Sequence, residues 1–64
     1  QTTPNNMVRN INKAAQQARR VVVRLTTGGK NQNYRIRERA TAAKRDNRLD
    51  ELIVIFPDGE VERF

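Results

Sequence analysis

Arginine is the residue type through which this sequence could do chemistry, and three arginines alternate near its middle. Arg35, Arg37 and Arg39 are each separated by one residue. In an extended strand, this spacing places neighbouring guanidinium groups about 6.7 Å apart on one face. Two phosphate steps along one DNA strand advance about 6.8 Å, and a guanidinium binds phosphate or guanine through two parallel hydrogen bonds. A solvated sheet face, with Arg37 or Arg39 paired to Glu60 or Glu62, explains the same spacing.

The charge of the whole chain favours a polyanionic partner. The 64 residues carry a net charge of +6. Residues 1–48 hold twelve Lys and Arg against two acids, whereas residues 49–64 hold one Arg against five acids. Such an imbalance is most typical of proteins that bind nucleic acid, and next most typical of proteins that bind an acidic protein surface. The candidate nucleic-acid-binding residues are Arg24, Lys30, Arg35, Arg37, Arg39, Lys44, Arg45 and Arg48.

Catalytic chemistry has little support in the residue types. The chain has no His and no Cys, which removes the usual metal ligands and the commonest nucleophile and base pairs. The segment TTGGK at residues 26–30 lacks the spacing of a phosphate-binding P-loop. We therefore expect no enzyme, no metal ion and no cofactor. The sequence predicts a small basic, non-enzymatic nucleic-acid-binding protein.

A protein-interaction or assembly module is the alternative function. The run Leu52–Phe56 is apolar on both faces of a strand, and one layer of helices covers only one of them. Ile53 and Ile55 are the predicted interface residues, facing an acidic protein or a second copy in a homodimer. A small viral accessory protein would fit this description. The run is far too short to cross a membrane, so we expect no membrane partner and a cytoplasmic location, or the host cytoplasm for a viral protein.

The N-terminal half predicts an arm, a helix and then an ambiguous segment. Residues 1–6 form a polar arm, and residues 7–64 form one small domain. Thr3 is a candidate N-cap before Pro4, and apolar residues then recur at helical spacing. Residues 21–27 are rich in Val and Thr, which favours a strand, although their spacing also permits one helix from about residue 5 to residue 27. Lys13 and Arg9 would lie on the outer helix face.

The C-terminal half predicts strands joined by turns. Residues 28–33 would form a hairpin loop in which glycines supply positive φ. A return strand from about Asn33 to Ala40 would place Tyr34 and Ile36 opposite the arginine row. Residues 41–48 are a connection or a helical turn, followed by a strand at 49–56, a turn at 57–59 and an edge strand at 60–64. The expected fold is α+β, with an N-terminal amphipathic helix packed on a small antiparallel sheet of three to four strands.

Overall fold

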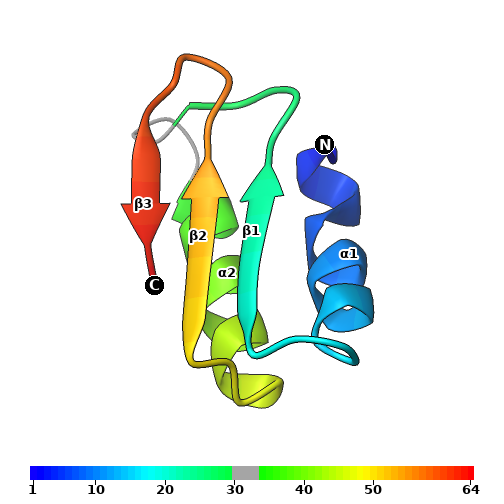
Figure 1. Cartoon of the computed structure of the whole chain (residues 1–64). Helices are drawn as coiled ribbons and strands as arrows, with labels where there is room; N and C mark the ends of the chain where they lie inside the picture. Colours follow the sequence, from blue (N-terminus) through cyan, green and yellow to red (C-terminus); the bar gives the residue numbers. More distant parts are fainter. Residues whose placement is uncertain (30–33) are drawn as a thin grey trace.

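Two helices pack on one face of a three-stranded sheet (Figure 1). The computed structural model describes residues 1–29 and 34–64. The elements are, in chain order, the 3-10 turn η1 (Pro4–Asn6), α1 (Met7–Ala14), β1 (Arg20–Arg24), α2 (Tyr34–Asp46), β2 (Glu51–Ile55) and β3 (Val61–Arg63). The predicted α+β class and its N-terminal helix are confirmed. Thr3 is the N-cap of η1 and Pro4 follows it, as expected, although the Thr3 side chain makes no capping hydrogen bond.

The sheet is mixed, whereas the sequence predicted an antiparallel one. Its order is β1-β2-β3. β1 runs parallel to β2, from Arg20 opposite Glu51 to Arg24 opposite Ile55, and β2 pairs antiparallel with β3. A parallel pair needs a long crossover between its strands, which is usually a helix. Here α2 is that crossover, so β1, α2 and β2 form a βαβ unit.

The predicted strand from Asn33 to Ala40 is wrong in the residues that the structure describes. Tyr34–Asp46 forms the helix α2, and Asn33 lies outside the described residues. The alternation of arginines that looked like a strand coexists with a helical spacing of buried residues at Ile36, Ala40 and Ala43. The segment is also rich in Ala, Arg, Lys and Glu, which are good helix formers. Helical burial therefore decides its conformation.

Other predicted elements are confirmed. The ambiguous segment after α1 is the strand β1, and the later strands and the turn before β3 lie where the sequence placed them. Gly28 and Gly59 have φ angles of 93° and 91°, a conformation that glycine adopts without strain. The predicted hairpin loop at residues 28–33 is followed by the helix α2, however, and not by a return strand. Most of that loop, including Lys30, lies outside the described residues.

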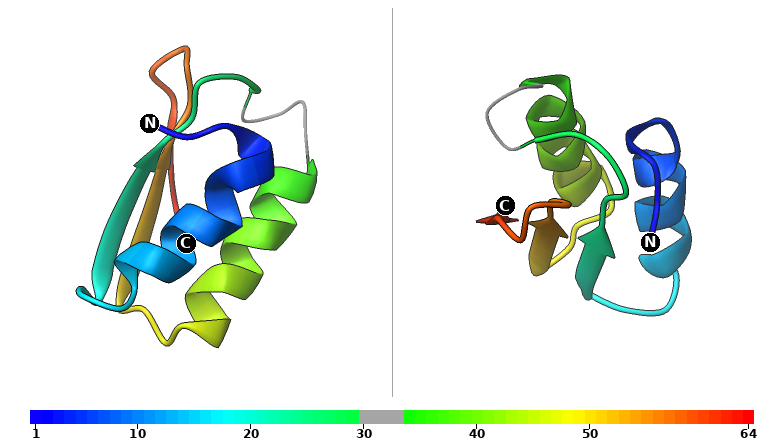
Figure 2. Two further views of the ribbon diagram at one scale, coloured as in Figure 1. Left: turned by 90° about the vertical axis from the view of Figure 1, so that its right-hand side faces the viewer. Right: turned by 90° about the horizontal axis from the view of Figure 1, so that it is seen from above.

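The core lies between the helices and the sheet, and the opposite sheet face has no covering element among the described residues. Both helices lie on one side of the sheet (Figure 2). The side chains that point from the strands toward the helices, such as Val21 and Val54, are buried, whereas Val22 on the other face of β1 is 60% exposed. The twelve apolar core residues are Met7, Ile11, Val21, Val23, Leu25, Ile36, Ala40, Ala43, Leu49, Leu52, Val54 and Phe56.

Candidate nucleic-acid interface

The predicted phosphate-binding residues do not form one surface. Arg24 lies at the end of β1, with its side chain alternating onto the open sheet face, and Lys30 lies outside the described residues. Arg35, Arg37 and Arg39 lie on α2, where helical geometry turns Arg37 away from the direction shared by the other two. The predicted row of three guanidinium groups on an extended strand is therefore absent.

Three of the predicted cations gather beside the C-terminal end of α2. A groove of about 390 Å³ is lined by Thr41, Lys44, Arg45, Arg48, Leu49 and Phe64. Residues 37, 41 and 44 follow a spacing of four and three, which aligns them as a stripe along α2, and Arg48 lies two residues after the helix ends. The stripe runs beside β3, because Glu62 of that strand contacts Arg37 and Phe64 follows the strand directly.

The end of α2 fixes the backbone that carries Arg48. The Leu49 N–H donates to the Lys44 carbonyl at 3.0 Å, and the Arg48 N–H donates to the Arg45 carbonyl at 3.1 Å. These two bonds form a Schellman motif, whose left-handed position is usually glycine. Arg48 occupies that position with a φ of 54°. A cation therefore stands beside the groove at a residue where glycine would be the less strained choice.

The end of α2 is also tied to the rest of the molecule. The Asn47 side-chain amide donates to the Ala43 carbonyl at 2.8 Å and to the Asn12 side-chain oxygen at 2.7 Å. Asn12 belongs to α1, so the two helices are joined where the groove begins. Leu49, the next apolar residue, is only 6% exposed and inserts into the core. The groove is thus built on anchored backbone.

The cations of the groove remain available to an anion. Arg45 pairs with the neighbouring Asp46 at 3.2 Å, but both side chains are more than 60% exposed, and such surface pairs are weak. Lys44 and Arg48 take part in no ion pair with any described residue. The helix C-terminus carries a partial negative charge that favours nearby cations, which is an alternative structural reason for their presence. That reason does not account for the strained backbone of Arg48.

Arg37 differs from these cations because a carboxylate of the same chain already engages it. Its Nε lies 3.0 Å from Oε2 of Glu62, and the Glu62 side chain is only 12% exposed. The buried Oε2 accepts no well-directed hydrogen bond, so the contact with Arg37 acts through charge. This ion pair joins α2 to β3. It matches the expectation that a C-terminal carboxylate would pair with Arg37, although the pair links a helix to a strand.

The groove also has an apolar wall that the sequence did not assign to a site. Phe64 is half-buried and packs against the margin of the core. Its N–H donates to the Leu52 carbonyl at 2.9 Å, which holds the residue beside β2. An aromatic ring next to cations is a combination that binds nucleotides, because bases stack on the ring while cations bind phosphates. The sequence does carry one signal for this position of Phe64. Alternation along the last strand puts Phe64 on the same face as Glu62, the residue that contacts Arg37 of α2.

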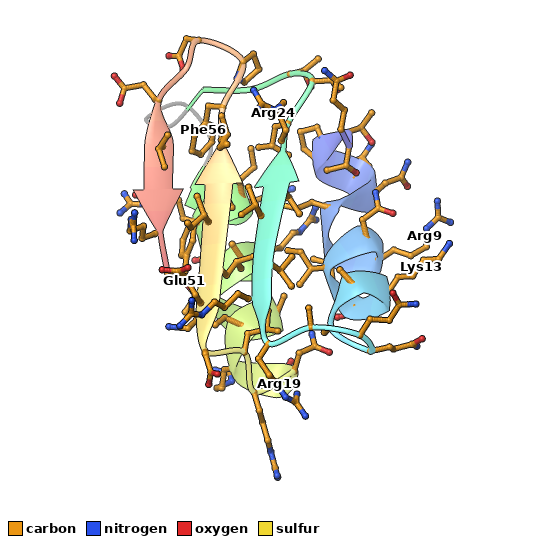
Figure 3. All side chains as sticks on the ribbon, viewed as in Figure 1. Arg9, Lys13, Arg19, Arg24, Glu51 and Phe56 are labelled. Carbon is orange, nitrogen blue, oxygen red and sulfur yellow. The ribbon has the colours of Figure 1, made fainter. Side chains whose placement is uncertain are left out.

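The predicted interface residues lie on the open sheet face. Ile53 and Ile55 are half-buried on β2, with Val22 of β1 opposite Ile53 and Val61 of β3 opposite Ile55. Arg63 is also opposite Ile53, and its guanidinium bonds Glu51 at 3.1 Å. Figure 3 looks onto this face, with Arg24 near one end of the sheet and Glu51 near the other. An apolar centre with arginines around it therefore lies on the side opposite the helices.

Within the described ranges 1–29 and 34–64, no group of three His, Cys, Asp or Glu residues is arranged to hold a metal ion. None of the helices in this part of the chain is both long and apolar enough to span a membrane.

Comparison with known families decides what kind of protein this is. A family model described as the contact-dependent growth inhibition CdiA C-terminal domain matches residues 1–61. The chain belongs to this family. No curated protein and no solved structure matches it.

Membership of the CdiA C-terminal domain family corrects three expectations. The family indicates a bacterial toxin, so the predicted function as a simple nucleic-acid-binding protein is wrong, and so is the alternative of a viral accessory protein. The prediction of a non-enzymatic protein is wrong at the family level too, because CdiA C-terminal domains are toxin effectors of the nuclease type. The absence of His and Cys excludes the most familiar catalytic sites but does not exclude catalysis by other residue types.

Two expectations agree with the family in their broader form. A nucleic acid or an acidic protein as partner is consistent with the CdiA C-terminal domains. Action in the cytoplasm is consistent as well, since these domains are delivered into the cytoplasm of target cells. The host cytoplasm of a virus has no support.

Proposed function

We propose that this chain is a growth-inhibiting toxin domain that cleaves nucleic acid in the cytoplasm of a target bacterium, and that the groove beside α2 holds the substrate. The groove is the observation that carries the proposal. It combines Lys44, Arg45 and Arg48 with the ring of Phe64, whereas the other predicted cations among the described residues are dispersed along β1 and α2 or paired.

The chemistry of the groove suits a phosphodiester. Lys44 and Arg48 can neutralise the phosphate and the further negative charge that develops on its oxygens during cleavage. The Thr41 hydroxyl can donate a hydrogen bond to the same group. Phe64 can stack on a base that follows the phosphate. These residues bind the substrate and stabilise charge, and each of them can be tested by substitution.

Induced expression in a bacterial host tests the toxin proposal. We expect the wild-type chain to stop growth and to leave fragmented cellular RNA or DNA, which gel electrophoresis of each nucleic acid would show. A variant with both Lys44→Gln and Arg48→Gly should restore growth at equal expression. Each lost charged hydrogen bond to the transition state should lower the cleavage rate by about tenfold or more.

A matched variant removes the same charge elsewhere. Arg9 and Lys13 project from α1 away from the sheet (Figure 3) and are exposed, so Arg9→Gln with Lys13→Gln, which keeps good helix formers in α1, should remain toxic. Unimpaired growth on wild-type expression would refute the toxin proposal. Growth arrest with intact RNA and DNA would support the toxin proposal but refute nucleic acid as the substrate.

We further propose that an acidic protein protects the producing cell by docking on the open sheet face. A cell that makes such a toxin needs a neutralising partner. Ile53 and Ile55 supply an apolar centre there, and Arg24 and Arg63 are cations at its margin. Acidic residues around an apolar patch would complement this surface. Two copies of the chain would instead bring like charges together, which disfavours a homodimer through this face.

A further inference from the structure

We propose that the free edge of β1 is occupied by a fourth strand, formed by the residues that directly precede Gln1 in the parent CdiA protein. The chain belongs to a family of C-terminal domains, so the parent chain reaches Gln1 from further upstream. The new strand would run parallel to β1. The inference depends on family membership and on backbone geometry, and not on the nucleic-acid groove.

Thr2 already forms the end of such a strand. Its N–H donates to the Arg24 carbonyl at 2.8 Å, and its own carbonyl accepts the Thr26 N–H at 2.9 Å. This pair of bonds is an isolated parallel bridge between Thr2 and Leu25. The Asn10 side chain also donates to the Thr2 hydroxyl, and Thr2 is only 7% exposed. The direction of the chain at Thr2 is therefore fixed by several contacts.

The rest of the β1 edge presents the groups that this strand would need. Leu25 N–H donates to Ile55 of β2, so odd-numbered residues of this segment bond inward and even-numbered residues face the outer edge. In the continued parallel ladder, the residue directly before Gln1 would donate to the Val22 carbonyl and accept from the Arg24 N–H. The backbone carbonyl of the third residue before Gln1 would accept the Val22 N–H.

The space along this edge is open and has α1 on one side. A groove of about 420 Å³ is lined by Gln1, Thr2, Asn10, Ala14, Val21, Val22, Val23 and Arg24. Asn10 and Ala14 come from α1, and the other lining residues come from β1 and the N-terminus. Figures 1 and 2 show α1 beyond the β1 edge, on the same side of the sheet as α2. A strand in this groove would lie under α1, as β1 and β2 lie under α2.

The handedness of the connection supports the same arrangement. From β1 through α2 to β2, the chain steps one strand across the sheet with its helix on the covered face. From the new strand through α1 to β1, the chain would step in the same direction with its helix on the same face. Both crossovers therefore have the same hand, as parallel units in one sheet almost always do.

A second copy of the chain is a poorer occupant of this edge. Two β1 strands related by a two-fold axis would pair antiparallel, whereas the bonds of Thr2 continue into a parallel ladder. Thr2 also occupies one end of the edge in every copy. The upstream segment of the same chain has neither conflict, and it meets β1 without the entropy cost of association.

Amide hydrogen exchange measured by NMR tests the proposal. Residues 1–64 would be compared with the parent's C-terminal region beginning ten residues before Gln1. We expect the Val22 and Arg24 amides to exchange at least about tenfold more slowly in the longer chain, because they become hydrogen-bonded. The Val61 and Arg63 amides face the opposite edge of the sheet, at β3, and should exchange equally fast in both chains. Unchanged exchange at Val22 would overturn the proposal.

Proline substitutions in the longer chain give a second readout that needs no folded short chain. Proline directly before Gln1 removes an N–H that faces β1, so it should lower the urea midpoint of unfolding. Proline one position further upstream removes an N–H that faces away from β1, so it should have a much smaller effect. Equal effects at both positions would refute the parallel register. Protection of Val22 that rises with protein concentration would assign the edge to a second copy instead, and both readouts are independent of toxicity.

Discussion

Arg48 holds a backbone conformation that an L-residue adopts at a cost, and it does so next to two other cations. At its φ of 54°, arginine carries about 1 kcal/mol of backbone strain that glycine would not carry. Glycine also has more conformational entropy in the unfolded chain, which offsets part of this gain in stability. We therefore expect Arg48→Gly to leave the free energy of unfolding unchanged or raised by up to about 1 kcal/mol, and to lower toxicity. Urea denaturation and growth assays check the two parts. A clear loss of stability would show that the Arg48 side chain serves the fold.

Arg37 and Glu62 stabilise the wall of the groove. Their ion pair at 3.0 Å links α2 to β3, and β3 leads directly to Phe64. Arg37→Ala would leave a largely buried carboxylate without its cation, which should cost about 1 kcal/mol of unfolding free energy. Arg39→Ala removes an exposed arginine of the same helix and should change stability by less than about 0.5 kcal/mol. Equal losses in urea denaturation would contradict the role of the pair.

At the scale of elements, the two faces of β1 behave differently. Val21 is 4% exposed and Val22 is 60% exposed, although they are neighbours in one strand. Val21→Thr places a hydroxyl among apolar side chains and should cost about 1–3 kcal/mol of unfolding free energy. Val22→Thr should cost less than about 0.5 kcal/mol in the chain of residues 1–64. Similar urea midpoints for both variants would mean that both faces of the sheet are covered.

Local patterns predicted most elements, and long-range pairing explains the error at α2. Alternation and β-branched residues located β1 and β2, and Pro57 with Gly59 located the turn before β3. Residues 34–40 satisfy a period of two and a period of 3.6 together, because both patterns bury Ile36 and Ala40. The exposure of Glu38 and the burial of Ala43 fit the helical period alone. The parallel pairing of β1 with β2 has no local signal in the sequence. Reading α2 as a strand therefore also produced a hairpin where a βαβ unit exists.

The sequence predicted some of the residues of the candidate site but not how they are arranged. Lys44, Arg45 and Arg48 were among the predicted residues, and the structure places them in one groove. Thr41 and Phe64 were not assigned to a site, because their position depends on how β3 packs beside α2. Whether Ile53 and Ile55 bind a partner is still a prediction, although their place on the open face agrees with their alternation along β2.

At the scale of the whole molecule, the sheet separates two surfaces with different chemistry. The groove beside α2 joins cations to an aromatic ring on the helix side, and the open face joins aliphatic side chains to arginines on the other side. Substrate and protecting protein would therefore bind on opposite sides. We expect an acidic partner to bind the variant carrying Lys44→Gln and Arg48→Gly as tightly as the wild type, which calorimetry with the purified partner would measure. Loss of its binding would place the partner over the groove.

Incubation of the purified protein with bacterial RNA and DNA tests the central claim most directly. We predict time-dependent cleavage of one of these nucleic acids by the wild type, and a rate lowered by about tenfold or more when Lys44→Gln and Arg48→Gly are combined. Arg9→Gln with Lys13→Gln should cleave at the wild-type rate. Cleavage that is equally fast in the groove variant would contradict the account, because the substrate would then lie elsewhere on the molecule.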